Sequence, residues 1–169
     1  MEQLKISLFN PLQIVLDDEA ISDFRTRKVI ALLVYLAAAP ETAHRRETVM
    51  TLLWPGMPDT SARANLRQVL FHLRKAIPDF VELGTDDADT GGADTLVPLL
   101  ITNRHTIQLN PAAPLWIDTS QFDARLRQVQ THDHHSLLTC PQCREDLEAA
   151  TDLYTGHFLA DFYLEDSSE

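Results

Sequence analysis

The sequence has few of the residues that mark a specialised class of protein. Two cysteines and five glycines occur in 169 residues, too few for a disulfide scaffold or a fibrous chain. No apolar run reaches the roughly 18 residues that a membrane span needs. The first residues also lack the basic and apolar regions of a secretion signal. We therefore expect a cytoplasmic protein without a membrane partner.

The common motifs of catalysis are also missing from the sequence. It shows no glycine-rich phosphate loop, no GxSxG elbow and no HExxH motif, and no paired carboxylates in a recognisable frame. We therefore do not expect an enzyme. At roughly 100–200 residues per domain, the length predicts one domain, or one domain and part of a second.

Charge is abundant but unevenly distributed. The formal net charge is -11, yet residues 25–75 contain nine of the fourteen basic residues and three of the twenty-five acidic ones. Nine minus three gives that segment +6, so the rest of the chain carries −17. The segregation indicates one basic face on an acidic protein. DNA-binding proteins show this pattern, and so do ordinary helices with solvated Arg and Lys side chains.

Two segments with strand patterns frame the basic region. Apolar and polar residues alternate over 4–8 and an apolar run follows at 13–16, which predicts an antiparallel hairpin. Beyond the basic region, β-rich runs at 96–101 and 106–109 flank a four-residue polar turn and predict a second hairpin. The acidic, glycine-containing segment 84–94 before this hairpin predicts a mobile loop.

Three segments between the hairpins have the spacing of helices. Apolar residues at i, i+3, i+4 and i+7 predict a first helix that ends before Pro40. A second, short helix is expected over 45–54, where a Pro-Gly pair stops it. A third is expected over 60–77, with Asp59 or Thr60 as its cap.

The third helix separates its side chains by face. With about 100° between successive residues, its apolar residues fall together and predict a buried face. Arginines occupy one flank and amide side chains lie outside the core, as in helices that read the major groove of DNA. Phe71 also points outward, where it can pack on a neighbouring element or contact a thymine methyl group. The residues expected to be buried are Ala62, Leu66, Val69, Leu70, Leu73 and Ile77.

The last third of the chain predicts a pair of antiparallel helices. One is expected over 116–130, starting near Asp118 or Thr119, and the other over 144–160. With the elements before it, this pair gives an α+β fold. The order is N-terminal antiparallel strands, three helices and a C-terminal hairpin, followed by an αα-hairpin.

Specific motifs accompany this order of elements. They are Phe24-Arg25-Thr26-Arg27-Lys28, Ala31-Leu32-Leu33-Val34-Tyr35-Leu36, Leu52-Leu53-Trp54-Pro55 and Ala62-Arg63-Ala64-Asn65-Leu66-Arg67-Gln68. They resemble the N-terminal region of SARP-type bacterial transcriptional activators, which begins with a winged helix-turn-helix of the OmpR-like type. Trp116-Ile117-Asp118 and residues 153–162 look like the start of the bacterial transcriptional activation domain that follows. The resemblance implies a DNA-binding domain over 1–112 and a truncated helical activation domain over 113–169.

The resemblance also implies how such a protein works. The third helix would enter the major groove of double-stranded DNA, and a wing near 102–106 would touch the adjacent minor groove. Such regulators bind repeated sites as pairs, hence as a homodimer on DNA, and recruit RNA polymerase through the loop that is Trp54–Asp59 here. No cofactor is required. By position, the DNA-binding residues are Arg63, Asn65, Arg67, Gln68, Arg74 and Lys75 in the third helix, Arg25, Arg27, Lys28, Arg45 and Arg46 for phosphates, and Arg104 in the wing.

A protein-interaction module with a winged-helix fold that does not bind DNA is the alternative. The acidic remainder of the chain and the outward-facing Phe71 favour this interpretation. The two interpretations differ in one geometric requirement. DNA binding needs the arginines of the third helix to be exposed on the same side as Arg27 and Arg104.

A cluster of histidine and cysteine lies between the two expected C-terminal helices. His132, His134, His135, Cys140 and Cys143 fall within twelve residues, and the Cys-Pro-Gln-Cys spacing suits a chelating pair. Cys140, Cys143, His135 and either His132 or His134 form one candidate set of ligands for a structural zinc. The alternatives are a solvated loop with two unliganded thiols, a disulfide, or a redox pair, although no thioredoxin-like pattern surrounds the cysteines.

Overall fold

The computed structural model describes residues 3–9, 11–83, 95–133 and 136–164, and it shows a mixed α+β architecture. The strands are β1 (Leu4–Ser7), β2 (Gln13–Leu16), β3 (Glu19–Ala20), β4 (His44–Arg45), β5 (Phe80–Leu83), β6 (Thr95–Pro98), β7 (Leu100–Thr102), β8 (Thr106–Leu109) and β9 (Leu115–Ile117). The helices are α1 (Arg27–Ala37), α2 (Arg46–Leu53), α3 (Asp59–Ala76), α4 (Asp118–Thr131) and α5 (Pro141–Leu153), with a short 3-10 turn at Leu137–Thr139.

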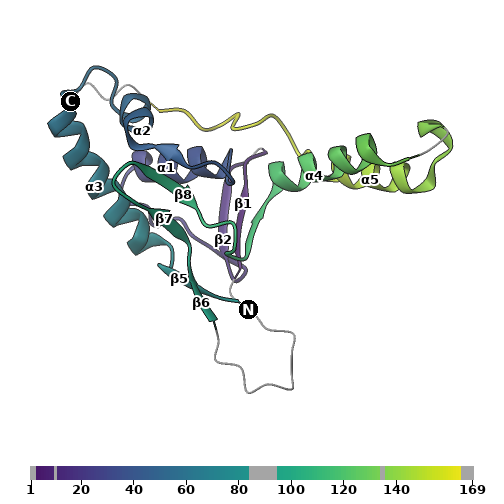
Figure 1. The fold of residues 1–169 in the computed structure, drawn as a ribbon, viewed down its shortest axis with the longest axis horizontal. Helices are drawn as coiled ribbons and strands as arrows, with labels where there is room; N and C mark the ends of the chain where they lie inside the picture. Colours follow the sequence, from purple (N-terminus) through teal and green to yellow (C-terminus); the bar gives the residue numbers. More distant parts are fainter. Residues whose placement is uncertain (1–2, 10, 84–94, 134–135, 165–169) are drawn as a thin grey trace.

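These elements form two parts that extend in opposite directions (Figure 1). Helices α1, α2 and α3 pack together with the strands, and α3 lies along the outer edge of that part. Helices α4 and α5 run side by side as an αα-hairpin that projects from the other end. Among the described residues, no helix is long and apolar enough to cross a membrane.

The predicted N-terminal hairpin is present and belongs to a larger sheet with the order β3-β2-β1-β9. Leu4 lies opposite Leu16 and Ile6 opposite Ile14 in the antiparallel β1–β2 pair. Asp17 and Asp18 form the turn between the antiparallel strands β2 and β3. Their φ angles are positive, 50° and 66°, as such a tight turn requires. Strand β9 extends the sheet by pairing parallel to β1, so a segment over a hundred residues away joins the N-terminal hairpin.

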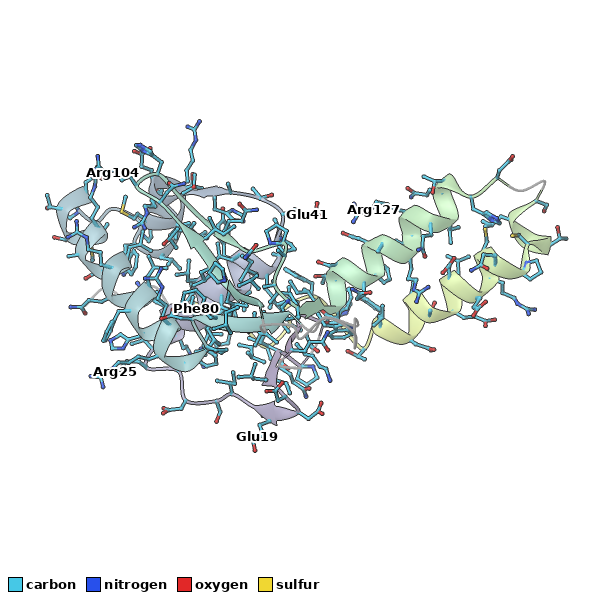
Figure 2. The ribbon with its side chains drawn as sticks, turned by 60° about the horizontal axis from the view of Figure 1, so that its bottom comes forward. Glu19, Arg25, Glu41, Phe80, Arg104 and Arg127 are labelled. Atoms are coloured by element: carbon cyan, nitrogen blue, oxygen red, sulfur yellow. The ribbon has the colours of Figure 1, made fainter. Side chains whose placement is uncertain are left out.

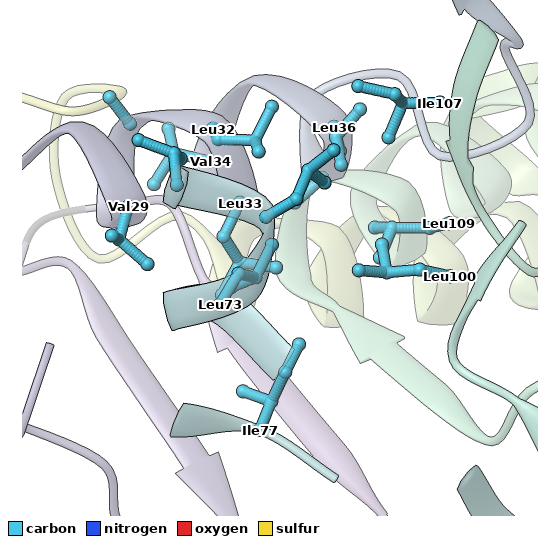
Figure 3. Close-up of a cluster of buried hydrophobic side chains, with 14 of the residues drawn as sticks. Val29, Leu32, Leu33, Val34, Leu36, Leu73, Ile77, Leu100, Ile107 and Leu109 are labelled. Carbon is cyan, nitrogen blue, oxygen red and sulfur yellow. The ribbon is translucent and has the colours of Figure 1, made fainter. Parts of the chain in front are cut away.

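One hydrophobic core joins α1, α3 and the hairpin β7–β8 (Figure 3). Leu32, Leu33 and Leu36 of α1 are fully buried, and Leu73 of α3 and Ile107 of β8 are buried with them. All six residues that the helical spacing of α3 predicts to be buried are buried. The burial of this stripe fixes the directions in which the polar side chains of α3 can point.

The β structure differs from the sequence prediction in its pairing. The strand expected over 96–101 is two strands, because β6 pairs with β5 and β7 pairs with β8. The change of partner occurs at Leu99, which is buried and donates its N–H to the carbonyl of Asp79. Strands β4 and β5 were not predicted. The acidic segment 84–94 lies outside the described residues.

The helix boundaries also need correction. Of the predicted segment 116–130, Trp116 and Ile117 lie in β9, and α4 begins at Asp118, one of the two predicted start positions. The helix expected over 144–160 ends at Leu153. Beyond it, Leu159 donates its N–H to the carbonyl of Leu8, and this tertiary contact competes with continued helix. No side chain of the described residues caps α3, because Asp59 is already its first residue.

Asp118 joins the αα-hairpin to the sheet. Its carboxylate accepts the N–H of Leu8 at 2.8 Å and that of Phe9 at 2.9 Å, and the side chain is buried, with 3% of its surface exposed. It also accepts the N–H of Thr119, the next residue of α4, at 2.7 Å. The domain boundary between residues 112 and 113 stays a prediction. Strands β1 and β9 lie on opposite sides of it in the sequence and pair with each other in one sheet.

Replacement of Asp118 by alanine should destabilise the protein. Two buried N–H groups would lose their acceptor, and we expect a decrease of about 2–4 kcal/mol in the free energy of unfolding. Urea denaturation of the full chain followed by circular dichroism measures this change. The exposed Asp123 of α4 is the matched control, since Asp123→Ala should change stability by less than about 0.5 kcal/mol. Equal effects of the two variants would contradict the role given to Asp118.

Candidate nucleic-acid interface

A groove lies between α2, α3 and the turn that joins β7 to β8, with a volume of about 1000 Å³. Its walls carry one acidic residue, Glu47, and many basic ones. The turn residues 102–106 form one side of it, and the apolar side chains of Met50 and Leu66 contribute to its lining. The arginines that line it are Arg45, Arg46, Arg63, Arg67 and Arg104.

Each of these arginines reaches the groove from a different local structure. Arg63 and Arg67 are exposed and lie one turn apart on α3, on one flank of the buried stripe. Arg45 ends β4, and Arg46 begins α2. Arg104 is exposed at the tip of the β7–β8 turn, at the edge of the domain in Figure 2. The fold thus collects charges that are spread over sixty residues of sequence.

Arg46 holds the turn against α2. Its backbone N–H donates to the carbonyl of His105 at 2.8 Å, and its Nε donates to the carbonyl of Asn103 at 2.8 Å. Burial, and after it the positive charges of Arg74 and Arg67, lower the pKa of the Arg46 guanidinium below its usual value. The guanidinium stays charged at neutral pH, so the groove concentrates positive charge that a bound anion would stabilise.

Asn103 shapes the turn that carries Arg104. Its Oδ1 accepts the N–H groups of His105 at 2.7 Å and Thr106 at 2.8 Å, and its Nδ2 donates to the hydroxyl of Thr106 at 2.8 Å. Asparagine favours turns because its side chain can bond to backbone groups two or three residues on. The sequence predicts the turn, but neither charge nor spacing singles out Asn103 or His105 as lining residues.

The other predicted residues of α3 differ in how freely they face solvent. Gln68 is exposed, whereas Asn65 is half-buried and donates to the Sδ of Met57 at 3.2 Å. Arg74 donates to the hydroxyl of Thr102 at 3.0 Å and pairs with Asp79 at 3.4 Å. These contacts tie α3 to β7 and to the residues after the helix.

Phe71 remains exposed over 55% of its surface and contacts residues of its own helix. The ammonium group of Lys75 lies 4.7 Å from the centre of its ring, and the ring of His72 packs against it edge-on. Lys75 is therefore drawn along the helix surface toward Phe71. Such a cation–π contact at an exposed site contributes about 0.5–1 kcal/mol.

The basic residues before and in α1 lie apart from the groove lining. Arg27 donates to the carbonyl of Tyr163 at 3.3 Å and its guanidinium lies over that ring. Lys28 donates to the carbonyl of Leu53 at 2.8 Å and lies over the ring of Trp54. Arg25 is exposed at the edge of the domain opposite Arg104 (Figure 2). The groove therefore unites five of the twelve predicted DNA-binding residues. Arg104 meets the geometric requirement for DNA binding, because it lines the groove with Arg63 and Arg67, whereas Arg27 contacts the C-terminal segment and is not part of the groove lining.

A second cluster of functional side chains lies in the αα-hairpin. His132, Cys140 and Cys143 have potential ligand atoms within 4.8 Å of one another. The backbone N–H of Cys143 lowers the pKa of the Cys140 thiol, and burial raises the pKa of the Cys143 thiol. Three of the four predicted zinc ligands are thus brought together. The fourth, His135, lies outside the described residues.

Comparisons with known proteins support the fold. No protein-family profile matches the sequence, and no curated protein sequence matches it. Among solved structures, that of Mycobacterium tuberculosis EmbR in complex with a low-affinity phosphopeptide matches 95% of this chain. The two share 21% of their residues with a TM-score of 0.66, and the chain spans 38% of the EmbR chain. The likeness shows that the two proteins share a mixed α+β fold over the matched residues.

Replacement of Asn103 by alanine should loosen the turn. The backbone N–H groups of His105 and Thr106 would lose their acceptor, so both should exchange hydrogen faster, and stability should decrease by about 1–2 kcal/mol. Hydrogen-exchange NMR measures both amides directly. Asn103→Asp keeps an acceptor oxygen and should preserve most of their protection. Unchanged exchange of the two amides in Asn103→Ala would show that the side chain does not hold the turn.

Proposed function

We propose that this chain is a DNA-binding transcriptional regulator with a winged helix-turn-helix. Helix α3 enters the major groove, and the β7–β8 hairpin acts as a wing at the adjacent minor groove. The observation that carries the proposal is the groove between these two elements, because five arginines line it and Glu47 alone offsets them. Arginine neutralises phosphates and reads guanine, so this set suits duplex DNA.

The dimensions of α3 agree with this role. The helix has 18 residues, which gives a length of about 27 Å at 1.5 Å per residue. The major groove of B-DNA, about 12 Å wide, admits one α-helix. The buried stripe that packs on α1 leaves the side with Arg63, Arg67 and Gln68 exposed to such a ligand.

The contacts of individual residues suggest a division of roles. Arg45, Arg46 and Arg104 flank α3 from outside and are placed to contact phosphates or the minor groove. Gln68 is exposed on α3, where an amide can pair with adenine. Asn65 and Arg74 already have hydrogen-bond partners within the protein, so their first role in this proposal is to position α3.

The resemblance to SARP-type activators extends the proposal to partners. The predicted loop Trp54–Asp59 comprises the connection between α2 and α3, residues 54–58, and the first residue of α3, and Gly56 turns the connection with a φ of 78°. Leu52, in the last turn of α2 beside this connection, is 49% exposed. We assign this exposed connection to contact with RNA polymerase, and we assign paired binding of two copies to repeated DNA sites.

Removal of two groove arginines should weaken binding to all DNA sequences. Each lost phosphate contact lowers the slope of log affinity against log salt by about 0.9. We therefore expect the Arg63→Ala/Arg67→Ala variant to lose up to about two units of slope on random duplex DNA. Fluorescence anisotropy over a series of salt concentrations measures the slope.

Arg127→Ala is the matched control for this experiment. Arg127 is an exposed arginine of α4, far from the groove in Figure 2. Its removal should leave the slope unchanged, although the net charge changes in the same direction. An unchanged slope in the double variant would remove both arginines from the interface. Absence of binding by the wild-type chain at low salt would favour the protein-interaction module instead.

Specificity should depend more on Gln68 than on Asn65. An exposed amide that pairs with a base contributes about 1–3 kcal/mol of discrimination, whereas Asn65 is held by Met57 within the protein. Selection of preferred duplexes from a random pool, followed by affinity measurement on them, compares Gln68→Ala with Asn65→Ala. We expect relaxed preference at one base position for Gln68→Ala only. The opposite ranking would show that Asn65 leaves Met57 when DNA binds.

A further inference from the structure

The end of α4 and the start of α5 bring three metal-binding side chains together, away from the arginine groove. His132 follows the last residue of α4, Cys140 directly precedes α5, and Cys143 lies in its first turn. The Nδ1 atom of His132 is 3.2 Å from the Sγ atom of Cys143 and 3.4 Å from that of Cys140. All three ligand atoms lie within 4.8 Å of one another, although the residues span twelve positions.

This arrangement is close to that of zinc ligands. Zinc binds thiolates at about 2.3 Å and imidazole nitrogen at about 2.0–2.1 Å with tetrahedral angles, so neighbouring nitrogen and sulfur ligands lie about 3.6 Å apart. The two nitrogen–sulfur distances here are only a few tenths of an ångström shorter. Small side-chain rotations would therefore bring the three ligand atoms to the distances found around a zinc ion. Cys140 and Cys143 are not joined by a disulfide bond in the structure.

The hairpin around the cluster has few fully buried apolar side chains. Along α4 and α5, the buried apolar side chains are Val129, Cys143 and Ala150. Arg125 adds an ion pair with the buried Asp146 at 2.8 Å. A unit with so small a core gains stability from a covalent or metal cross-link.

We propose that His132, Cys140 and Cys143 bind a zinc ion that links the end of α4 to the start of α5. The two thiolates neutralise the charge of Zn²⁺, and their protons are released to solvent on binding. A closed structural zinc site takes four ligands. Three of them come from the part of the chain that the structure describes. The ion holds the helices of the hairpin in register and takes part in no reaction.

Metal titration of the full chain tests the site. The protein is stripped of metal with a chelator, kept reduced, and titrated with Zn²⁺ against a chromophoric chelator and separately with Co²⁺. We expect one ion per chain, a near-ultraviolet thiolate-to-cobalt charge-transfer band, and a higher unfolding temperature with Zn²⁺. Absence of stoichiometric binding by the reduced protein, or a Co²⁺ spectrum without thiolate bands, would overturn the proposal.

Substitutions at the three ligands distinguish the loss of a zinc ligand from a disturbance of the hairpin fold. Cys143 is fully buried, so its replacement can disturb the hairpin, whereas Cys140 is half-buried and His132 is exposed. Cys140→Ser and His132→Ala should each lower zinc affinity at least tenfold, since even loss of an outer-shell partner costs 10–100-fold. His157→Ala removes an exposed histidine outside the cluster and should leave the affinity unchanged.

The variant series also distinguishes zinc from the other chemistry of two nearby thiols. Wild-type affinity in both Cys140→Ser and His132→Ala would overturn the assignment. So would a protein that forms a Cys140–Cys143 disulfide in air and binds no zinc after reduction, because the pair would then be a redox couple. Circular dichroism of each variant confirms that the helices are retained before the affinities are compared.

Discussion

The hydrogen bonds of Arg46 to the β7–β8 turn make the candidate interface one surface. Through its backbone and its side chain, Arg46 connects α2 to Asn103 and His105. Arg74 makes the corresponding connection from α3 through the hydroxyl of Thr102. The turn that carries Arg104 is therefore fixed against the two helices. The same bonds hold several like charges close together, and an anionic ligand would relieve that repulsion.

The distribution of charge explains why an acidic protein can present such a surface. The basic residues are concentrated in the segment 25–75, and the core stripe of α3 directs its arginines outward. The acidic remainder of the chain includes the αα-hairpin, which projects from the opposite end (Figure 1). Proteins with this asymmetry approach a polyanion in a preferred orientation, because the field steers the encounter.

The sequence predicts the local elements well, because their signals are local. Helical spacing identifies α1 and α3, and alternation identifies the β1–β2 hairpin. Strand β9 and the irregular segment after Leu153 escape prediction. Both exist through contacts with β1 and the residues after it, more than a hundred positions away. A short segment that completes a sheet has no periodicity of its own that would distinguish it from the start of a helix.

The candidate site shows the same limit at the level of single residues. Charge and helical position correctly mark Arg63, Arg67 and Arg104 as exposed. They do not reveal that Arg27 contacts Tyr163 or that Lys28 contacts Leu53, because these partners are far away in sequence. Spacing in the αα-hairpin identifies the cysteines as a chelating pair, but it does not show that the packing of α4 on α5 brings His132 next to both thiols.

Hydrogen exchange of the chain with and without saturating duplex DNA at low salt shows whether the arginine groove binds DNA. We expect DNA to protect the amides of two segments, the first half of α3 and the turn residues 102–106. We expect unchanged exchange in α4 and α5. Protection confined to the αα-hairpin, or none at either wall of the arginine groove, would contradict the assignment of this groove as the DNA-binding surface.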